Sequence, residues 1–391
     1  MQVIDIVLIV ILVVALLAGL QRGLLASLGS LLGLVGGAFA ALWAIPLVND
    51  ALPTQQWRPL VVIGGTLLLL VVGIAIGGGI GMALRRGVDR TPLRGFERLL
   101  GGAASVVIAA LAASFVGQGL VATGMPVVAP AIGSSTVLRT IDSLTPRPVQ
   151  TTLAQLRAAV LDEGIPRLGG LLAPETETGP LPAIALDSPR LEAAAASVGL
   201  ISGVAYACGT SSTGSGFVAA PDLVVTNAHV VAGVDAPVVE LPGRAAREGR
   251  VVYFDPVDDL AVIEIDDLDA AALGITEPLE PGASAVVQGY PYGGPFSSGP
   301  ARVLSATSAP VPDIYEDASA PREIYALQAQ VVPGNSGGPL LTTDGDVAGV
   351  VFARADDGRE VGYAMTTAEL LPVLAQADAF EQPVSTGACT S

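Results

Sequence analysis

The chain has 391 residues, enough for two or three domains, and it carries a formal net charge of −17 with only 14% charged residues. A hydrophobic share of 51% excludes a disordered chain. Residues 1–124 hold 7 Arg and 4 acidic residues, whereas residues 125–391 hold 12 Arg and 32 acidic residues. The second part is therefore too acidic to bind phosphate groups, and we expect no nucleic-acid partner.

Four apolar stretches fill the first third of the chain. They cover residues 4–21, 23–47, 59–84 and 99–123. A helix needs about 20 apolar residues to cross a bilayer, and backbone amides in lipid must bond within their own segment. The first stretch does not resemble an ordinary signal peptide, because it carries Asp5 instead of basic residues at its start. Residues 1–124 therefore predict an all-α, four-helix transmembrane domain.

The basic residues predict the orientation of this domain. Arg22 lies between the first two stretches, and a cluster lies between the third and fourth: Arg85, Arg86, Arg90, Arg94 and Arg98. Loops rich in arginine stay in the cytoplasm. Four spans then place both termini outside, so we expect a multi-pass plasma-membrane protein whose residues after about 124 are periplasmic or extracellular.

Glycines recur at a spacing of four in the second and third apolar stretches: Gly29, Gly33, Gly37, Gly73, Gly77 and Gly81. This spacing places small residues on one helix face and lets two helices approach closely. The glycines predict an interface for self-association, a path through the membrane, or ordinary packing inside a four-helix bundle. The four-span, arginine-looped, glycine-rich pattern of residues 1–125 resembles the CvpA (colicin V production) family of membrane domains.

Residues 125–199 read as a connector. Leucines and valine at helical spacing predict a short amphipathic helix between Pro148 and Glu163. The stretch from Pro174 to Pro182, rich in Pro, Thr and Glu, predicts an exposed linker. It is either a plain spacer or a flexible tether that can be cleaved.

Residues 200–391 contain short apolar runs separated by Gly, Pro and Asp, a pattern typical of an all-β barrel or sandwich. Two stretches in the first half of this region suggest chemistry. The only histidine, His229, lies in a Thr-Asn-Ala-His-Val sequence, and imidazole can accept and return a proton near neutral pH. Asp259 directly precedes an apolar run, and Asp255 and Asp258 are alternatives for a carboxylate that orients the imidazole.

The third stretch, Pro-Gly-Asn-Ser-Gly-Gly-Pro around Ser336, is the most specific. Serine is a weak nucleophile unless a base removes its proton. Gly334 and Gly337 flank it closely, so backbone N–H groups can turn inward and stabilise a negatively charged oxygen.

The order His229, Asp259, Ser336 with these flanks resembles the chymotrypsin-like serine peptidases, and most closely their bacterial HtrA/Deg branch. The resemblance covers about residues 200–375 and implies an all-β double-barrel peptidase domain with its site between two six-stranded barrels. It implies that His229 is the general base, Asp259 orients it and Ser336 is the nucleophile. Gly334, Asn335 and Ser336 would supply the oxyanion N–H groups, and no cofactor or metal is expected.

HtrA proteins usually carry a PDZ domain after the peptidase, but this sequence continues for only about 55 residues past Ser336. The combination of a CvpA-like membrane domain with such a peptidase resembles the MarP-type membrane-anchored periplasmic proteases. That resemblance implies a role in acid and oxidative stress resistance.

The two cysteines, Cys208 and Cys389, both fall in the region predicted to lie outside. An oxidising compartment favours their pairing. We therefore predict a disulfide that fixes the carboxy-terminal tail to the first half of the peptidase domain.

Resemblance to the family places the primary specificity pocket next to the segment before Ser336 and along a later strand. The candidates are Gln330, Val331, Val347 and Val350. Gln330 stands six residues before Ser336, where trypsin-like enzymes have Asp, so we expect preference for an uncharged side chain. Residues 347–352 could also pair with an extended substrate.

We therefore predict a membrane-tethered serine endopeptidase that cleaves periplasmic or cell-envelope proteins through an acyl-enzyme. Its partners would be protein or peptide substrates and the lipid membrane. Two alternatives stay open. One is a non-enzymatic membrane scaffold or transport component with a β-rich binding module. The other is a protease that cleaves mainly itself.

Overall fold

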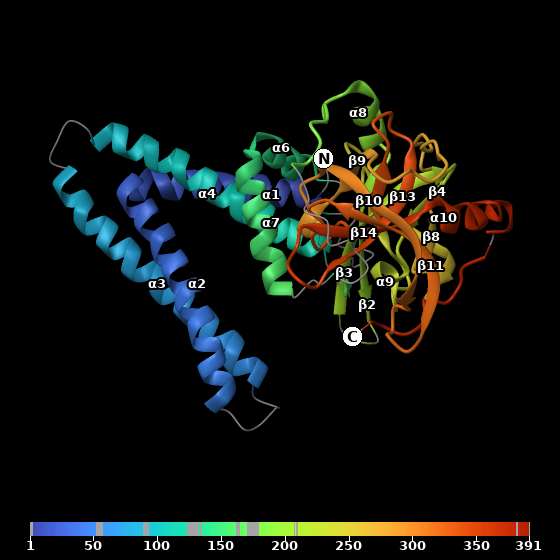
Figure 1. Ribbon diagram of the computed structural model, residues 1–391. Coiled ribbons are helices and arrows are strands. Elements are labelled where there is room, and N and C mark those ends of the chain that lie inside the picture. Colours follow the sequence, from blue (N-terminus) through green and yellow to red (C-terminus); the bar gives the residue numbers. More distant parts are fainter. Residues whose placement is uncertain are drawn as a thin grey trace. The chain divides into compact units, whose positions relative to one another are not determined.

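The computed structural model describes residues 3–51, 58–88, 94–122, 132, 135–161, 165–169, 180–206, 208, 210–380 and 382–390. The chain divides into two compact units, Met1–Ser114 and Phe115–Ser391 (Figure 1). The division predicted from sequence, at residues 124 and 199, stays a prediction. Most of the predicted linker between Pro174 and Pro182 lies outside the described residues.

The first unit is helical. Its long helices are α1 (Val3–Arg22), α2 (Leu24–Ala51), α3 (Arg58–Val88) and α4 (Arg94–Ala122), the last of which continues into the second unit. Among the described residues, two helices are long and apolar enough to cross a membrane, Val3–Arg22 and Arg94–Gln118. Leu24–Gly37 and Val71–Arg85 are shorter apolar segments. A helical amino-terminal region is thus confirmed, and four spans stay a prediction.

The glycines at spacing four pack α2 against α3. A Cβ added at Gly33 would lie 2.0 Å from the carbonyl oxygen of Gly73, and one at Gly29 would lie 2.3 Å from that of Gly77. The reverse substitutions meet equally close carbonyl oxygens, 2.1 Å at Gly73 and 2.0 Å at Gly77. Only glycine allows the two backbones to approach this closely. These glycines therefore serve packing within one chain, which was one of the predicted roles.

The α1–α2 turn and the end of α3 meet at one end of the helical unit. Arg85 Nη1 donates to the carbonyl oxygen of Gln21 at 2.7 Å, and Arg85 Nε lies 3.4 Å from Glu97 Oε2. Glu97 also accepts from the amide of Leu25 at 3.2 Å. The turn that carries Arg22 thus lies next to the end of α3 and the start of α4.

The second unit contains two seven-stranded sheets. The first in chain order is β6-β5-β2-β3-β4-β8-β7, and the other is β1-β13-β12-β9-β10-β11-β14. The first sheet comprises β2 (Val198–Ala205), β3 (Thr210–Ala220), β4 (Leu223–Thr226), β5 (Val238–Glu240), β6 (Arg247–Glu248), β7 (Arg250–Asp255) and β8 (Leu260–Glu264). The other comprises β1 (Arg167–Leu168), β9 (Ser284–Gly289), β10 (Ser297–Pro312), β11 (Ser319–Gln328), β12 (Pro339–Leu341), β13 (Val347–Ala355) and β14 (Val361–Thr366).

The carboxy-terminal sheet closes on itself. Besides its linear order, β13 pairs with β14, so six antiparallel strands form a continuous ring to which β1 adds in parallel. One hydrophobic cluster, including Val303, Tyr325 and Leu340, draws most of its residues from this ring. A larger cluster joins residues of both sheets, such as Phe217 and Tyr363. Burial of this shared apolar surface fixes the two sheets against each other.

Short helices complete the second unit. They are α6 (Thr136–Leu144), α7 (Arg147–Leu161), α8 (Pro189–Ala195), α9 (Ala228–Val231) and α10 (Thr367–Leu374), with single 3-10 turns η2 (Pro291–Gly293) and η3 (Ala377–Ala379). The amphipathic helix predicted between Pro148 and Glu163 is present as α7.

Candidate active site

His229 and Asp259 are bound to each other at the edge of the first sheet. His229 lies on α9, directly after β4, and Asp259 lies in the turn between β7 and β8. His229 Nδ1 lies 2.8 Å from Asp259 Oδ2 and 3.0 Å from Oδ1, and the backbone N–H of His229 donates to Oδ1 at 2.9 Å. Because an ionised carboxylate can only accept, the contact places the imidazole proton on Nδ1 and leaves Nε2 as the acceptor.

The local backbone explains why Asp259 makes this contact. Asp259 has φ +55°, a left-handed conformation that aspartate tolerates better than most residues, and its carbonyl oxygen accepts from Asn227 Nδ2 at 2.8 Å. Asp259 is only 3% exposed. The alternative Asp255 instead accepts from the amides of Val257 and Asp258 in its own turn. Of the three candidates, Asp259 is the one hydrogen-bonded to His229.

Ser336 lies in the loop between β11 and β12 and is 2% exposed. Its carbonyl oxygen accepts from the amide of Ser215 at 2.7 Å. A Cβ added at the next residue, Gly337, would lie 2.3 Å from Thr226 Oγ1 and 3.0 Å from the amide nitrogen of Asn227. The serine loop therefore packs directly against the segment that precedes His229. Within the described residues, the buried atoms Ser336 Oγ and His229 Nε2 have no hydrogen-bond partner.

Gly334 is required by its conformation and its surroundings. Its φ is +88°, and an added Cβ would lie 2.3 Å from the carbonyl oxygen of Tyr290. The neighbouring Pro333 carbonyl accepts from the amide of Tyr292 at 2.6 Å. A side chain at position 334 would thus collide with the backbone of residues 290–293, which packs against the loop that carries Ser336.

The three predicted oxyanion N–H groups are not equivalent. The amide of Asn335 donates to the carbonyl oxygen of Val332 at 3.1 Å, and Asn335 Oδ1 accepts from the amide of Val332 at 3.0 Å. Asn335 therefore stabilises the loop internally. In the part of the chain that the structure describes, the N–H groups of Gly334 and Ser336 make no hydrogen bond.

Ser215 supports the serine loop and was missed by the sequence analysis. Its hydroxyl donates to the carbonyl oxygen of Gly334 at 2.7 Å and accepts from the amide of Tyr290 at 2.9 Å. It thus connects β3, the serine loop and the loop after β9. The available signal was its position between Gly214 and Gly216 within a strand, because such glycines often mark close approach of another backbone.

The four predicted specificity residues lie in different places. Gln330 is exposed and lines a groove of about 570 Å³ that also touches Val332 and Asn335 beside Ser336. Val331, Val347 and Val350 are buried in hydrophobic clusters, with exposed fractions of 5%, 0% and 0%. Of these four, Gln330 is the one whose side chain faces the groove.

The backbone of β13 is paired with a strand on each side. Few backbone groups of residues 347–352 are therefore left for the predicted pairing with a substrate. Val350 pairs with Pro339 and with Met365. Further along, Arg354 and Ala355 pair with Arg167 and Leu168 of β1, which comes from the connector.

Cys208 and Cys389 form a disulfide, as the two-cysteine count predicts. The tail that carries Cys389 binds the segment after α9, because the amide of Gly233 donates to the carbonyl oxygen of Thr386 at 3.1 Å. A Cβ added at Gly233 would lie 2.7 Å from Cys389 Sγ. The disulfide therefore fixes the tail next to the short helix that carries His229.

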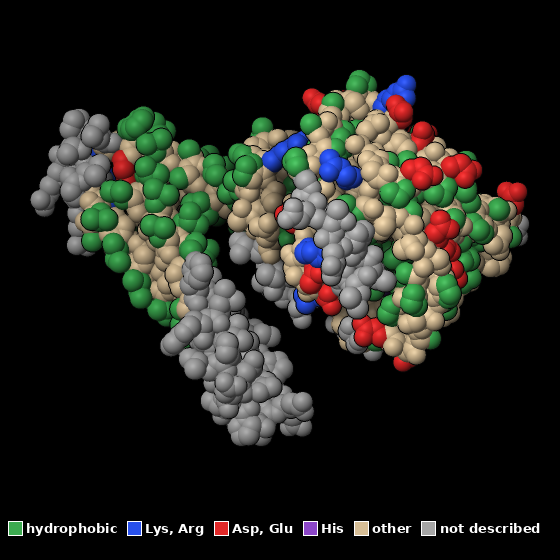
Figure 2. Space-filling view, viewed as in Figure 1, with side chains coloured by type: hydrophobic (Ala, Val, Ile, Leu, Met, Phe, Trp, Pro, Cys, Tyr) green, Lys and Arg blue, Asp and Glu red, His purple; other side chains and the backbone are tan. Residues whose placement is uncertain are grey.

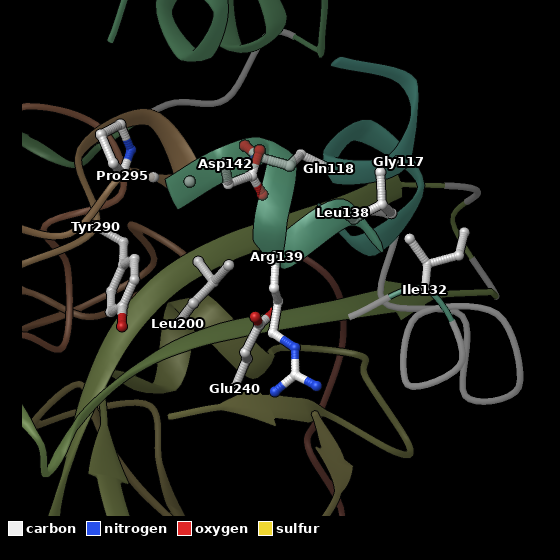
Figure 3. A pocket seen from close by; sticks show the side chains of 12 residues that line it. Gly117, Gln118, Ile132, Leu138, Arg139, Asp142, Leu200, Glu240, Tyr290 and Pro295 are labelled. Carbon is white, nitrogen blue, oxygen red and sulfur yellow. The ribbon is translucent and has the colours of Figure 1, made fainter. Parts of the chain in front are cut away.

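A second cavity, of about 120 Å³, is lined in part by Tyr290 and Gly293, whose backbone atoms lie next to Gly334. Figure 3 shows the side chain of Arg139 extending toward Glu240, and Tyr290 also lines this cavity. Burial and, less strongly, the nearby carboxylate of Asp142 raise the pKa of Glu240 to about 7, and Arg139 opposes this shift. Glu240 is thus a half-buried carboxyl group whose pKa lies near neutral pH.

Two comparisons with protein families match the two parts of the chain. The Colicin V production protein family matches residues 4–146, and the Trypsin-like peptidase domain matches residues 214–350, which include His229, Asp259 and Ser336. Serine protease Rv3671c of Mycobacterium tuberculosis (strain ATCC 25618 / H37Rv) is 36% identical over 319 residues, covering 80% of this chain and 79% of that protein. The chain belongs to the Rv3671c family of serine proteases.

Solved structures and a more distant relative agree. The crystal structure of the active form of the Rv3671c protease from M. tuberculosis is 40% identical with a TM-score of 0.51, over 56% of this chain and 98% of that one. A probable periplasmic serine endoprotease, DegP-like, of Marinomonas sp. (strain MWYL1) is 35% identical over 175 residues, covering 42% of this chain and 35% of that protein. The Rv3671c-family chain is thus a membrane-associated serine endopeptidase, and the non-enzymatic scaffold alternative is set aside.

Proposed function

We propose that this Rv3671c-family chain hydrolyses peptide bonds through an acyl-enzyme formed on Ser336. His229 Nε2 accepts the proton of Ser336 Oγ as that oxygen attacks the substrate carbonyl, and later returns it to the leaving amine. Asp259 holds the imidazole in the required tautomer and stabilises the imidazolium. The 2.8 Å contact between His229 Nδ1 and Asp259 Oδ2, beside the packed serine loop, carries this proposal.

The N–H groups of Gly334 and Ser336 stabilise the negative oxygen of the tetrahedral intermediate in this proposal. Asn335 contributes by its side chain, which holds the amide of Val332 and so the shape of the loop. Donors that are fixed before the reaction stabilise the developing charge without reorganisation. The tight packing of Gly334 against Tyr290 supports such a fixed loop.

The membrane part is proposed to be a four-span bundle of the plasma membrane, with the double-barrel peptidase part on the periplasmic or extracellular side. Figure 2 shows hydrophobic side chains over the visible, described part of the helical unit, and large apolar residues of this unit are strongly exposed, such as Val3 at 80% and Leu32 at 71%. Such surfaces need lipid or a partner to cover them. Digestion by protease added to intact spheroplasts should remove the peptidase part and leave the helical part protected.

We further propose that the substrates are cell-envelope proteins with an uncharged residue at the primary site. The exposed amide of Gln330, instead of a carboxylate, lines the groove beside Asn335 and supports this preference. Resemblance to the MarP type supports a role in acid and oxidative stress resistance. Comparison of envelope cleavage products in wild-type and Ser336→Ala cells tests both the substrate class and the preference.

The mechanism is tested by covalent labelling. A fluorophosphonate probe should label the folded full-length protein in detergent on Ser336, and Ser336→Ala should abolish the label. His229→Ala should reduce labelling by several orders of magnitude, since the chain has no second histidine. Undiminished labelling of Ser336→Ala, or a wild-type protein that never reacts, would contradict the proposal.

Self-cleavage is a second candidate, because part of the connector pairs with β13, the strand that also binds the serine loop. β1 pairs with Arg354 and Ala355 near the end of β13, and Val351 of the same strand binds the loop that carries Ser336. The predicted linker begins a few residues after β1 in the sequence. A chain that cleaves mainly itself should shorten on storage while Ser336→Ala stays intact. If the shortened chain hydrolyses added peptides as fast as the full-length chain does, the protease also acts on other proteins.

A further inference from the structure

Arg322 is a buried arginine at the junction of the two sheets. It lies on β11 and is 1% exposed. Its Nη1 donates to the carbonyl oxygen of Asp258 at 3.4 Å, and its Nη2 donates to that of Pro312. The guanidinium carbon lies 5.4 Å from the centroid of the Phe352 ring. A fork of this kind can hold two carbonyl groups at once, which lysine cannot do with the same geometry.

The surroundings of Arg322 are strongly acidic. Four carboxylates act electrostatically on the charge of its guanidinium: Asp259, Asp258, Glu369 and Asp255. Tyr253 adds a hydroxyl that donates to Asp255. Burial lowers the pKa of Arg322 and these carboxylates counteract that effect. A buried charge is expensive unless opposite charges compensate it, so the arginine and this acidic turn stabilise each other.

Arg322 also contacts both halves of the site. On one side it binds the turn that ends in Asp259, which belongs to the first sheet. On the other side it lies over Phe352 of β13, and the preceding residue, Val351, accepts from the amide of Gly337 at 2.8 Å and donates to Gly338 at 2.9 Å. One side chain therefore lies between the elements that hold Asp259 and the loop that holds Ser336.

From this placement we infer that Arg322 is a positioning residue of the proteolytic site, which keeps the Asp259 turn in place and balances its negative charge. The inference rests on the proposed roles of His229, Asp259 and Ser336. Without the positive charge of the guanidinium, the negative charges of Asp259 and of the carboxylates around it would be uncompensated next to His229. They would stabilise the protonated imidazole, which cannot accept the proton of Ser336.

For full-length protein in detergent, the test measures kcat/KM of a peptide substrate against pH, and the second-order rate constant of labelling by the fluorophosphonate probe against pH. In Arg322→Met, which keeps an apolar stem but no charge, we expect at least about a tenfold loss near neutral pH. We also expect the acidic limb of the profile to move upward by about one pH unit. Arg322→Lys keeps the charge and should leave the limb near its wild-type position while lowering kcat.

Arg250→Met is the matched control. It removes one positive charge from the far end of β7, where Arg250 makes half-exposed ion pairs with Glu264 and Asp266. Solvent screens these pairs, so the pH profile should stay in place. A purely structural role for Arg322 would instead lower the activity of Arg322→Met equally at every pH, and that result would overturn the inference.

A double substitution guards against misfolding as the explanation. Arg322→Met with Asp258→Asn removes one positive and one negative charge, so the acidic limb should return toward the wild-type position if charge balance is the cause. A limb that stays displaced would overturn the electrostatic part of the inference. Failure of the proposed mechanism itself would be distinct, since the wild-type protein would then show no Ser336 label at any pH.

Discussion

Asp259 binds His229 at two points, the ring Nδ1 and the backbone amide. One carboxylate therefore fixes both the orientation of the imidazole and the position of the short helix that carries it. The two residues lie 30 positions apart in the sequence, and the contact depends on the pairing of β4 with β8, in which Thr226 lies opposite Ala261.

Asp259→Asn should reduce kcat/KM by about 10⁴-fold, because an amide can stabilise the wrong tautomer of the imidazole and cannot balance the imidazolium. Asp266→Asn, at an exposed position, should change it less than twofold. Peptide hydrolysis by the two purified variants checks this. A loss below about tenfold for Asp259→Asn would mean that another carboxylate orients His229.

Gly334→Ala should reduce activity by at least about 10²-fold, because the added methyl group would displace the loop from Tyr290 and misplace the oxyanion N–H groups. Gly358→Ala is the matched control, since Gly358 has a similar φ of +78° but an added Cβ would meet no atom within 4 Å. The control should lose only about 1–2 kcal/mol of stability through backbone strain. Equal activity of both variants would exclude a special role for the Gly334 conformation.

Removal of the disulfide by Cys208→Ser with Cys389→Ser should lower the free energy of unfolding by about 2–5 kcal/mol, since the bond closes a loop of 181 residues in sequence separation. Activity should fall as well, because the tail would no longer be fixed beside Gly233 and α9. Thermal unfolding and peptide hydrolysis measure the two effects. Wild-type protein treated with a reductant should behave like the variant, and an unchanged melting temperature in both would contradict the prediction.

Glu240 should make the folded state more stable at acidic pH. Its pKa is raised from 4.5 to about 7, so the folded state binds the proton more tightly than the unfolded state, and stability falls as the pH rises through this interval. Glu240→Gln should therefore be more stable than wild type by about 2–3 kcal/mol at pH 8 and no different at pH 4. Thermal unfolding across this range measures the difference.

The exposed Glu248 on the neighbouring strand β6 provides the control for this experiment. Glu248→Gln should leave the pH dependence of wild type unchanged, because its carboxylate stays in water in both states. If Glu240→Gln and wild type lose stability in parallel as the pH rises, another group is responsible for the dependence.

Much of the site could be predicted from sequence, because the chemistry needs rare residue types in short, recognisable segments. A single histidine, a glycine-bordered Ser336 and the cysteine count limited the candidates. The same local information left Asp255, Asp258 and Asp259 as alternatives. The choice among them depends on a backbone turn with φ +55° at Asp259, which is set by the strands on either side.

Tertiary structure alone decided which residues surround this site. Arg322 lies in a strand with no local motif, and Ser215 lies more than a hundred residues before the loop it supports. Val331 and Val350 were candidates for the specificity pocket, but in the closed ring of strands their side chains point into the hydrophobic core. Sequence determines which side chains are available and their local conformation. Their neighbours depend on register and sheet closure, which are set by contacts between distant segments.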